Sequence, residues 1–324
     1  MNFCVSYEVI MDFLSLMLNS MPATMAEGLF YGIFALGVYI TYKILDVADL
    51  TVDGSIVTGC AVTAVCILYG VDPLLAVFIA FLAGMLAGAL TGFFHTVLGI
   101  PALLSGILSQ FSLYTINMII MGLKDIGSAL IPMAPTANIS VSKYDLIVSS
   151  RYKTEAMIIG LIFVVAIIAI MYWFFGTELG CSLRATGANS KMARAQGINT
   201  NMTTMLGLMI SNGLVALAGG LLAQYTGSSL LTFGAGSIVI GLAAVIIGDV
   251  LCSAIFKKGA NFAVKLSFVV IGSIIYSLIK RVVINVNLDA NFLKLVSAII
   301  VAIFLAVPSF KAKPKHKRKA KEVK

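Results

Sequence analysis

The sequence predicts an all-α protein, a polytopic transmembrane helical bundle of nine or ten spans. Three observations lead to this expectation: 60% of the 324 residues are hydrophobic, only 11% are charged, and the mean hydropathy is +1.03. A water-soluble domain is about 45–50% apolar and about 25% charged, so lipid must cover much of this surface. The composition therefore excludes a water-soluble enzyme, a secreted disulfide module and a disordered chain.

Nine apolar segments are long enough to be spans, because a helix needs about 20 residues to cross a core about 30 Å thick. They are residues 24–44, 54–71, 73–97, 101–122, 155–175, 203–225, 236–255, 261–284 and 290–308. The shorter segment 9–21 is either a tenth span or a helix in the membrane interface. We therefore divide the chain into an N-terminal helix (1–23), a transmembrane domain (24–308) and a basic tail (309–324).

The positive charge is concentrated in the tail. Residues 311–324 hold eight Lys or Arg and one Glu, so the tail carries +7 of the formal net charge of +8. This pattern is typical of a cytoplasmic tail beside anionic lipid, and no aromatic residue interrupts it as in a nucleic-acid-binding arm. We expect membrane lipid and no nucleic acid as a partner. Counting spans back from the tail places the loop at 178–198 on the cytoplasmic side.

Motifs for bond-making chemistry do not occur in the sequence. There is no phosphate-binding GxxxxGK[ST], no HExxH and no GxSxG. The two histidines, His95 and His316, are isolated, and the five cysteines form no CxxC pair. We expect no catalytic residue, no metal site and no cofactor in this chain.

Three carboxylates lie between the first two long spans, namely Asp46, Asp49 and Asp53. None can face lipid, where each would cost several kcal/mol, so they must reach water, pair, or accept hydrogen bonds from backbone N–H groups. Two interpretations are open. The segment is either an interfacial turn in which Asp53 caps the following helix, or a broken helix that lines a solute path.

The cytoplasmic loop between the fifth and sixth spans has the features of a docking element. We expect Gly187 to break one helix, Asn189 or Ser190 to cap a short second helix at 191–196, and Gly197 to end that helix. A loop that only joins two spans would need no capped ends. The pattern therefore predicts a small helix that fits a groove on another protein.

Polar and small residues also follow helical spacing within the spans. Gln110, Tyr114 and Asn117 lie at i, i+4 and i+7 and share one helix face, so this face should look inward. Either interhelical hydrogen bonds or a weakly polar solute path would satisfy such groups. The same alternatives apply to polar residues of the sixth span, Ser211, Asn212 and Gln224.

Three glycines of the third span, Gly84, Gly88 and Gly92, recur at every fourth residue. They occupy one helix face, and small residues at this spacing let two helix backbones approach closely in lipid. We expect this face to pack against another helix of the same chain, with a dimer contact as the alternative.

Several of these stretches together resemble a known family. They are the loop at 178–198 and the sequences Gly32-Ile-Phe-Ala-Leu-Gly37, Asp49-Leu-Thr-Val-Asp53-Gly54, Ser211-Asn212-Gly213 and Gly236-Ser-Ile-Val-Ile-Gly241. They are similar to permease subunits of bacterial ATP-binding-cassette (ABC) importers of the branched-chain amino acid and ribose type, closest to an uncharacterised or tryptophan-type subgroup. The loop departs from the Glu-Ala-Ala start of the best-known importer pattern.

The resemblance implies a multi-pass permease of the bacterial cytoplasmic membrane, with its C-terminus in the cytoplasm, that moves a small solute inward by alternating access. The solute would be an amino acid or a related amphipathic molecule. Because this chain has no phosphate-binding loop, a partner ATPase would hydrolyse ATP. The other implied partners are an extracytoplasmic solute-binding protein or lipoprotein and a second permease copy, identical or paralogous.

The candidate residues form two groups. The coupling loop, which would meet the ATPase, would use Glu178, Gly180, Arg184, Gly187, Asn189, Ala193 and Gly197. The translocation path would use Asp49, Asp53, Gln110, Tyr114, Asn117, Ser211, Asn212 and Gln224. Two other functions remain open: an ion-coupled secondary transporter with a proton or sodium site at Asp46, Asp49 or Asp53, and a non-transporting scaffold.

Overall fold

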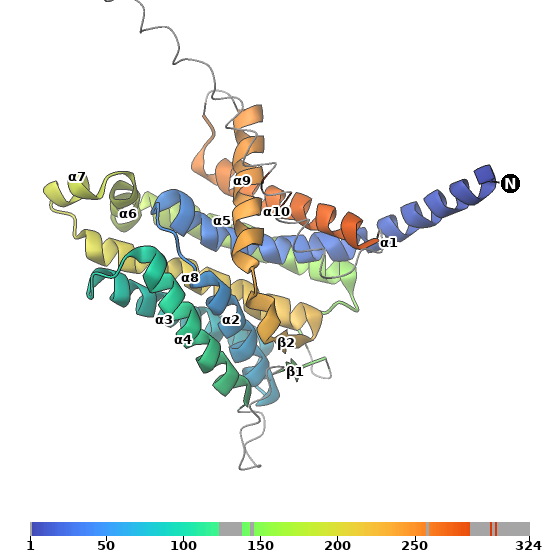
Figure 1. The fold of residues 1–324 in the computed structure, drawn as a ribbon, viewed down its shortest axis with the longest axis horizontal. Helices are drawn as coiled ribbons and strands as arrows, with labels where there is room; N and C mark the ends of the chain where they lie inside the picture. Colours follow the sequence, from blue (N-terminus) through green and yellow to red (C-terminus); the bar gives the residue numbers. More distant parts are fainter. Residues whose placement is uncertain are drawn as a thin grey trace, which may run out of the picture.

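The computed structural model describes residues 2–122, 138–142, 146–256 and 259–285, with the isolated positions 299 and 302, and within these ranges it describes side chains from residue 20 to residue 284. The elements are α1 (Asn2–Tyr39), the π-helical turn η1 (Ile40–Ile44), α2 (Val52–Leu68), α3 (Pro73–Thr96), α4 (Ala102–Gly122), β1 (Asn138–Ser140), α5 (Lys153–Gly176), α6 (Glu178–Ala188), α7 (Ser190–Ala195), α8 (Thr200–Thr226), β2 (Ser228–Leu230), the 3-10 turn η3 (Leu231–Gly234), α9 (Ser237–Ile255) and α10 (Phe262–Asn285) (Figure 1). The two short strands pair antiparallel. The all-α prediction is confirmed.

The predicted spans agree with the observed helices. Seven of the described helices are long and apolar enough to cross a membrane, and α2, with 17 residues, is a shorter apolar helix. These eight correspond to eight of the nine predicted segments. The helix α1 runs unbroken through residues 9–21. The ninth segment, apart from positions 299 and 302, and the tail at 309–324 lie outside the described residues.

The central helix of the bundle is α8, with α1, α2 and α3 packed around it (Figure 1). The glycine face of α3 makes one of these contacts. A Cβ atom on Gly84 would lie 2.4 Å from the carbonyl oxygen of Asn212, and a Cβ atom on Gly88 would lie 2.3 Å from that of Leu208. The predicted intramolecular packing of this face is confirmed, because only glycine permits this backbone approach.

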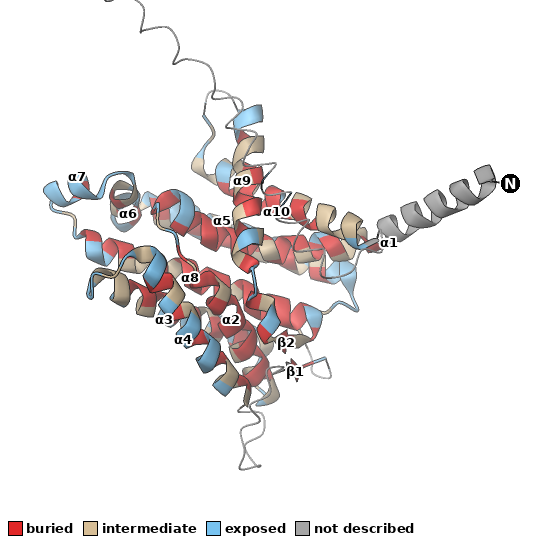
Figure 2. Cartoon of the chain, in the orientation of Figure 1, coloured by how far each residue is buried: buried red, intermediate tan, exposed pale blue. Residues whose placement is uncertain are grey.

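The outer surface is apolar where lipid would cover it. Figure 2 shows buried residues along α8 and α2, and exposed residues on the outer sides of α3, α4 and α5. Several exposed side chains are large and apolar, including Leu86, Ile162 and Trp173, which are 70%, 62% and 71% exposed. Such faces are expected when lipid solvates the helices, because lipid tails are as apolar as leucine.

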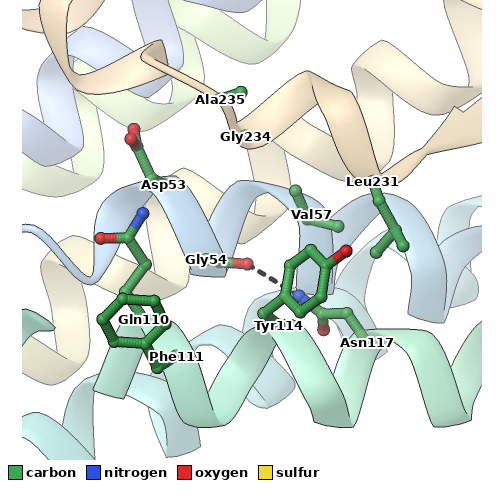
Figure 3. Close-up of a pocket in the computed structure, with 10 residues that line it drawn as sticks. All are labelled: Asp53, Gly54, Val57, Gln110, Phe111, Tyr114, Asn117, Leu231, Gly234 and Ala235. Carbon is green, nitrogen blue, oxygen red and sulfur yellow. Dashed lines mark hydrogen bonds between the residues drawn. The ribbon is translucent and has the colours of Figure 1, made fainter. Parts of the chain in front are cut away.

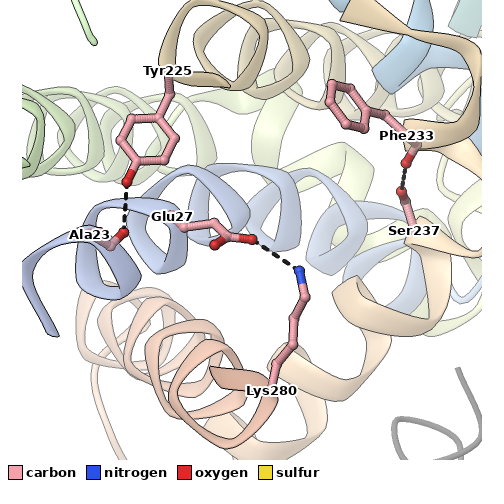
Figure 4. Close-up of polar contacts among 6 residues, drawn as sticks. All are labelled: Ala23, Glu27, Tyr225, Phe233, Ser237 and Lys280. Carbon is pink, nitrogen blue, oxygen red and sulfur yellow. Dashed lines mark hydrogen bonds and ion pairs between the residues drawn. The ribbon is translucent and has the colours of Figure 1, made fainter. Parts of the chain in front are cut away.

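Polar contacts join the helices at the end of the bundle opposite α6 and α7. The ammonium of Lys280 on α10 lies 3.0 Å from Oε1 of Glu27 on α1, and the Tyr225 hydroxyl of α8 donates to the Ala23 carbonyl at 3.0 Å (Figure 4). Near the end that carries α6 and α7, Lys43 of η1 pairs with Asp249 of α9 at 2.9 Å. The first two contacts fix α1, and the third fixes η1, to helices that are distant in sequence.

Candidate functional site

Two spans of the bundle are interrupted close to the same place. Between η1 and α2 the backbone is non-helical at residues 45–50, and Asp46 has a φ of 55°. Between η3 and α9 the chain turns at Gly236, whose φ is 84°. Asp49 in the first break contacts Asn212, which lies near the middle of α8. The first break therefore reaches the interior of the bundle, as the broken-helix interpretation requires.

Asp53 joins the two interruptions. Its carboxylate accepts hydrogen bonds from the backbone N–H groups of Ile238 at 2.7 Å and Gly236 at 3.3 Å, at the start of α9. A carboxylate is stabilised at this position by the unpaired N–H groups and the dipole of the helix. The expectation that Asp53 caps its own helix is wrong, because the carboxylate caps α9 and Thr51 is the N-cap residue of α2.

A cleft of about 380 Å³ lies beside Asp53, between α2, α4 and the η3 turn. It is lined by Asp53, Gly54, Val57, Gln110, Phe111, Tyr114, Asn117, Leu231, Gly234 and Ala235 (Figure 3). Three of the α4 residues, Gln110, Tyr114 and Asn117, are those that the sequence spacing places on one helix face. Figure 3 shows Gln110 and Tyr114 reaching from α4 toward α2. The cleft thus brings together four of the predicted path residues.

The cleft combines hydrogen-bond acceptors with aromatic surface. The Asn117 amide donates from Nδ2 to the Gly54 carbonyl at 3.1 Å, while its Oδ1 is buried without a hydrogen-bond partner (Figure 3). This oxygen is buried together with the rest of the Asn117 side chain, so a solute in the cleft does not contact it. The rings of Phe111 and Tyr114 are 72% and 48% exposed. With the half-buried Asp53 carboxylate on its wall, the cleft can accept a solute that carries both N–H donors and apolar surface.

The other four predicted path residues do not line this cleft. Asp49, Ser211, Asn212 and Gln224 are buried and bonded within the chain. Ser211 donates to the Gly37 carbonyl at 2.8 Å, and Gln224 donates to the Pro73 carbonyl at 2.9 Å. These bonds join α8 to α1 and α3, which corresponds to the interhelical alternative.

The loop between α5 and α8 contains the expected short helix. The Asn189 side chain accepts a hydrogen bond from the Met192 N–H at 3.0 Å and caps α7, which begins one residue earlier than predicted. Gly197 follows with a φ of 82°, which glycine adopts without strain. The choice between Asn189 and Ser190 as the cap is thus resolved for Asn189.

Gly187 does not break a helix, contrary to the sequence-based expectation. It lies inside α6, and the helix ends at Asn189, whose φ is −162°. A Cβ atom on Gly187 would lie 1.8 Å from the Ile44 carbonyl oxygen and 2.9 Å from the Leu45 Cα. Gly187 is therefore a packing residue that lets α6 touch the backbone of η1.

Other candidate residues of the loop divide into anchoring and exposed ones. Gly180 packs on the backbone of the α5 end, and the Arg184 guanidinium donates to the Phe175 carbonyl and lies 5.9 Å from the centre of the Phe262 ring. Ala193 is only 4% exposed, whereas Glu178, Asn189 and Gly197 are exposed. The loop is thus held firmly to its own chain and presents α7 outward.

Sequence reasoning missed two kinds of residue. Met192 on α7 is 63% exposed, an unusual position for a large apolar side chain outside a lipid-facing span. Leu231 and Gly234 line the cleft but lie far from the other lining residues in sequence. For Met192 the signal was present, an apolar residue three positions after a cap. For Leu231 and Gly234 no local signal exists.

Comparisons with known proteins identify relatives over most of the chain. Residues 21–308 match the family described as branched-chain amino acid transport system / permease component. The chain is 36% identical over 289 residues to the tyrosine transport system permease protein of Clostridioides difficile (strain R20291), covering 89% of this chain and 91% of the relative. It is 28% identical over 232 residues to the inner membrane ABC transporter permease protein YjfF of Escherichia coli (strain K12), covering 71% and 67% of the two chains.

Two solved structures are similar in fold. A putative metal-chelate type ABC transporter in an inward-facing conformation has a TM-score of 0.49 at 18% identity, covering 91% of this chain and 87% of that one. PsaBC from Streptococcus pneumoniae in complex with Fab has a TM-score of 0.49 at 16% identity, covering 95% and 98%. An ion-coupled secondary transporter finds no support in the matched family. The chain belongs to the branched-chain amino acid transport system permease family and is a multi-pass membrane permease subunit of an ABC transport system, not an enzyme.

Proposed function

We propose that this permease carries an amino acid with an aromatic or apolar side chain, and that the cleft between α2, α4 and η3 forms part of its path. The observation that carries the proposal is the combination of the Asp53 carboxylate with the Phe111 and Tyr114 rings in one cleft. The similarity to a tyrosine transport system permease supports the same class of solute.

The chemistry of the cleft suits such a solute. The ammonium group of an amino acid donates three hydrogen bonds, and the Asp53 carboxylate is a suitable acceptor for one of them. An aromatic side chain would lie against the exposed rings of Phe111 and Tyr114. The cleft volume of about 380 Å³ lies within the range of small-molecule sites, about 300–1,000 Å³. Its open shape suits a permease, which must release its solute.

The energy for uptake would come from a partner ATPase. We propose that the ATPase docks on the coupling loop, which we define as α6 and α7, in the cytoplasm, where the C-terminal tail would also lie. The exposed, capped α7 helix supports this assignment. A second permease copy would cover the exposed side of the cleft, and an extracytoplasmic solute-binding protein would deliver solute at the opposite end. ATP binding and hydrolysis would then alternate access to the path.

Uptake by proteoliposomes that contain the permease, its ATPase and its binding protein tests this function. With tritiated tyrosine outside and ATP inside, we expect accumulation that unlabelled tryptophan or phenylalanine reduces and ribose does not. Asp53→Asn should reduce uptake at least several-fold. Asp72→Asn is a matched control, because this carboxylate is exposed and caps α3 away from the cleft. Uptake that proceeds without ATP, or that ribose inhibits instead of amino acids, would refute the proposal.

A further inference from the structure

Asp49 is a carboxylate buried where two parts of the bundle meet. Its side chain is 4% exposed, and it has no ion pair among the residues that the structure describes. Its oxygens instead accept hydrogen bonds from the Thr51 N–H at 2.9 Å and from the Asn212 amide at 2.8 Å. A buried charge needs such bonds to be tolerated, so removing either donor leaves an unsatisfied carboxylate.

Asn212 extends the contact to the cleft. While Nδ2 donates to Asp49, its Oδ1 accepts a hydrogen bond from the Ser55 hydroxyl at 2.7 Å. Thr51 and Ser55 enclose the first turn of α2, on which Asp53 and Gly54 line the cleft. The pair of Asp49 and Asn212 therefore connects the middle of α8 to the turn of α2 that forms one wall of the cleft.

The coupling loop is fixed to the N-terminal end of α8 by side-chain hydrogen bonds. The Thr186 hydroxyl of α6 lies 2.8 Å from the Thr203 hydroxyl of α8. Arg194 of α7 donates from Nη2 to the Thr200 hydroxyl at 2.9 Å. A displacement of the loop would therefore move α8 with it.

The coupling loop also touches the start of the segment that contains Asp49. Gly187 approaches the Ile44 carbonyl of η1, and Leu45 packs against the position of Gly207 on α8. From there the non-helical residues 45–50 lead directly to Asp49. Two routes from the loop, one through α8 and one through η1, thus converge on this carboxylate.

The non-helical segment at residues 45–50 has the features of a hinge. It follows a π-helical turn, a rare form that is frequently found at functional sites. Asp46 within it is the one non-glycine residue with a positive φ in the described part of the chain. Backbone in this region is sparsely populated and is retained where the surroundings hold it. The segment therefore has a bend at Asp46 and a fixed point at Asp49.

We propose that Asp49 is a positioning residue that transmits movement of the coupling loop to the cleft wall formed by the first turn of α2. This inference rests on the proposed ATP-driven function. It assigns Asp49 to the coupling machinery and not to the solute path. Its carboxylate is needed because it accepts from both Thr51 and Asn212, whereas an amide in its place would turn its NH₂ group toward one of these donors.

The test uses the reconstituted complex of permease, ATPase and binding protein, with a reporter in the cleft. Tyr114→Cys places a thiol in the cleft, and this variant is the parent of the variants below. Its labelling by a membrane-permeant maleimide, above the labelling of the unsubstituted chain, is followed with and without ATP and vanadate. This reporter needs no knowledge of the solute. ATP hydrolysis is measured in parallel samples without vanadate. The test variant is Asp49→Asn, and the matched control is Asp46→Asn, the same substitution at an exposed position of the same segment.

A second variant separates coupling from simple loss of packing. The double substitution Asp49→Asn with Asn212→Asp exchanges the two groups. The new amide at position 49 would donate to the new carboxylate at position 212 and would still accept from the Thr51 N–H, while the carboxylate would accept from Ser55. The bond from position 212 to the Leu208 carbonyl, 3.0 Å with Asn212, is lost, and a carboxylate oxygen would then face this carbonyl, so restoration should be incomplete.

We expect ATP and vanadate to change the labelling rate several-fold in the parent and in Asp46→Asn. In Asp49→Asn the change should fall to less than twofold while ATP hydrolysis stays within about twofold of the parent, and the double variant should restore most of the change. The proposal is overturned if Asp49→Asn keeps the full change, or if labelling and hydrolysis fall together without restoration. A parent that shows no change refutes the proposed ATP-driven mechanism itself.

Discussion

The contact between Gly187 and η1 gives a sharp prediction for the substitution Gly187→Ala. The added Cβ would lie 1.8 Å from the Ile44 carbonyl oxygen and 2.8 Å from the Ile44 carbonyl carbon. Both are backbone atoms, so no side-chain rotation can relieve the overlap. An ordinary contact distance requires α6 and η1 to separate by about 1.5 Å. Overpacking of this kind costs about 1–3 kcal/mol.

Gly176→Ala is the matched control for this substitution. Gly176 is the last residue of α5, and a Cβ added there meets no atom within 4 Å. Both substitutions replace a helical glycine and carry a similar gain in helix propensity of up to about 1 kcal/mol. The difference in unfolding temperature between the two variants therefore reports the cost of the overlap with Ile44.

The assay compares the two purified variants by thermal unfolding in detergent and by ATP hydrolysis in the reconstituted complex. We expect Gly187→Ala to lower the unfolding temperature by several degrees relative to Gly176→Ala and to lower solute-dependent stimulation of the ATPase. The stimulation should fall because α6 can no longer rest on η1. If the two variants unfold at the same temperature and stimulate the ATPase equally, the reasoning about this contact is refuted.

Three smaller changes test other parts of the structure. Asn189→Ala removes the cap of α7, which should cost about 1 kcal/mol of helix stability and reduce ATPase binding in pull-down titrations; unchanged binding would contradict the docking role. Gly88→Ala places a Cβ 2.3 Å from the Leu208 carbonyl and should lower the unfolding temperature in detergent, so an unchanged temperature would contradict the close packing of α3 on α8. A double-mutant cycle of Lys43→Met and Asp249→Asn should give a coupling free energy of less than about 1 kcal/mol, because both side chains are about half exposed. A larger coupling free energy would indicate a buried pair.

Sequence patterns predicted local features of the site correctly where the cause is local. The spacing of Gln110, Tyr114 and Asn117 follows from the helical repeat, and these residues do line one cleft. The capped helix α7 was also predicted, because a cap depends on residues three positions apart. Gly187 was assigned the wrong role, since glycine within a helix and glycine at its end look alike in sequence. The contact with Ile44 decides between them.

The hydrogen-bond partners of Asp49 and Asp53 could not be predicted from local sequence patterns. Both were expected to reach water, pair, or accept backbone hydrogen bonds, and both interpretations of their segment were open. Asp53 caps a helix whose first N–H groups are about 185 residues away, and Asp49 is bonded to Asn212, 163 residues away. No periodicity in the chain encodes such partners.

Length, composition and hydropathy are enough to predict a bundle of membrane helices with a capped loop between two of them. Lipid imposes length and hydropathy on every span, and these properties are written in consecutive residues. Which polar side chains join helices and which line the cleft depends on the packing of the folded bundle. Ser211 and Gln110 both lie within spans, but one is buried against Gly37 and the other lines the cleft. The packing of helices distant in sequence sets this difference.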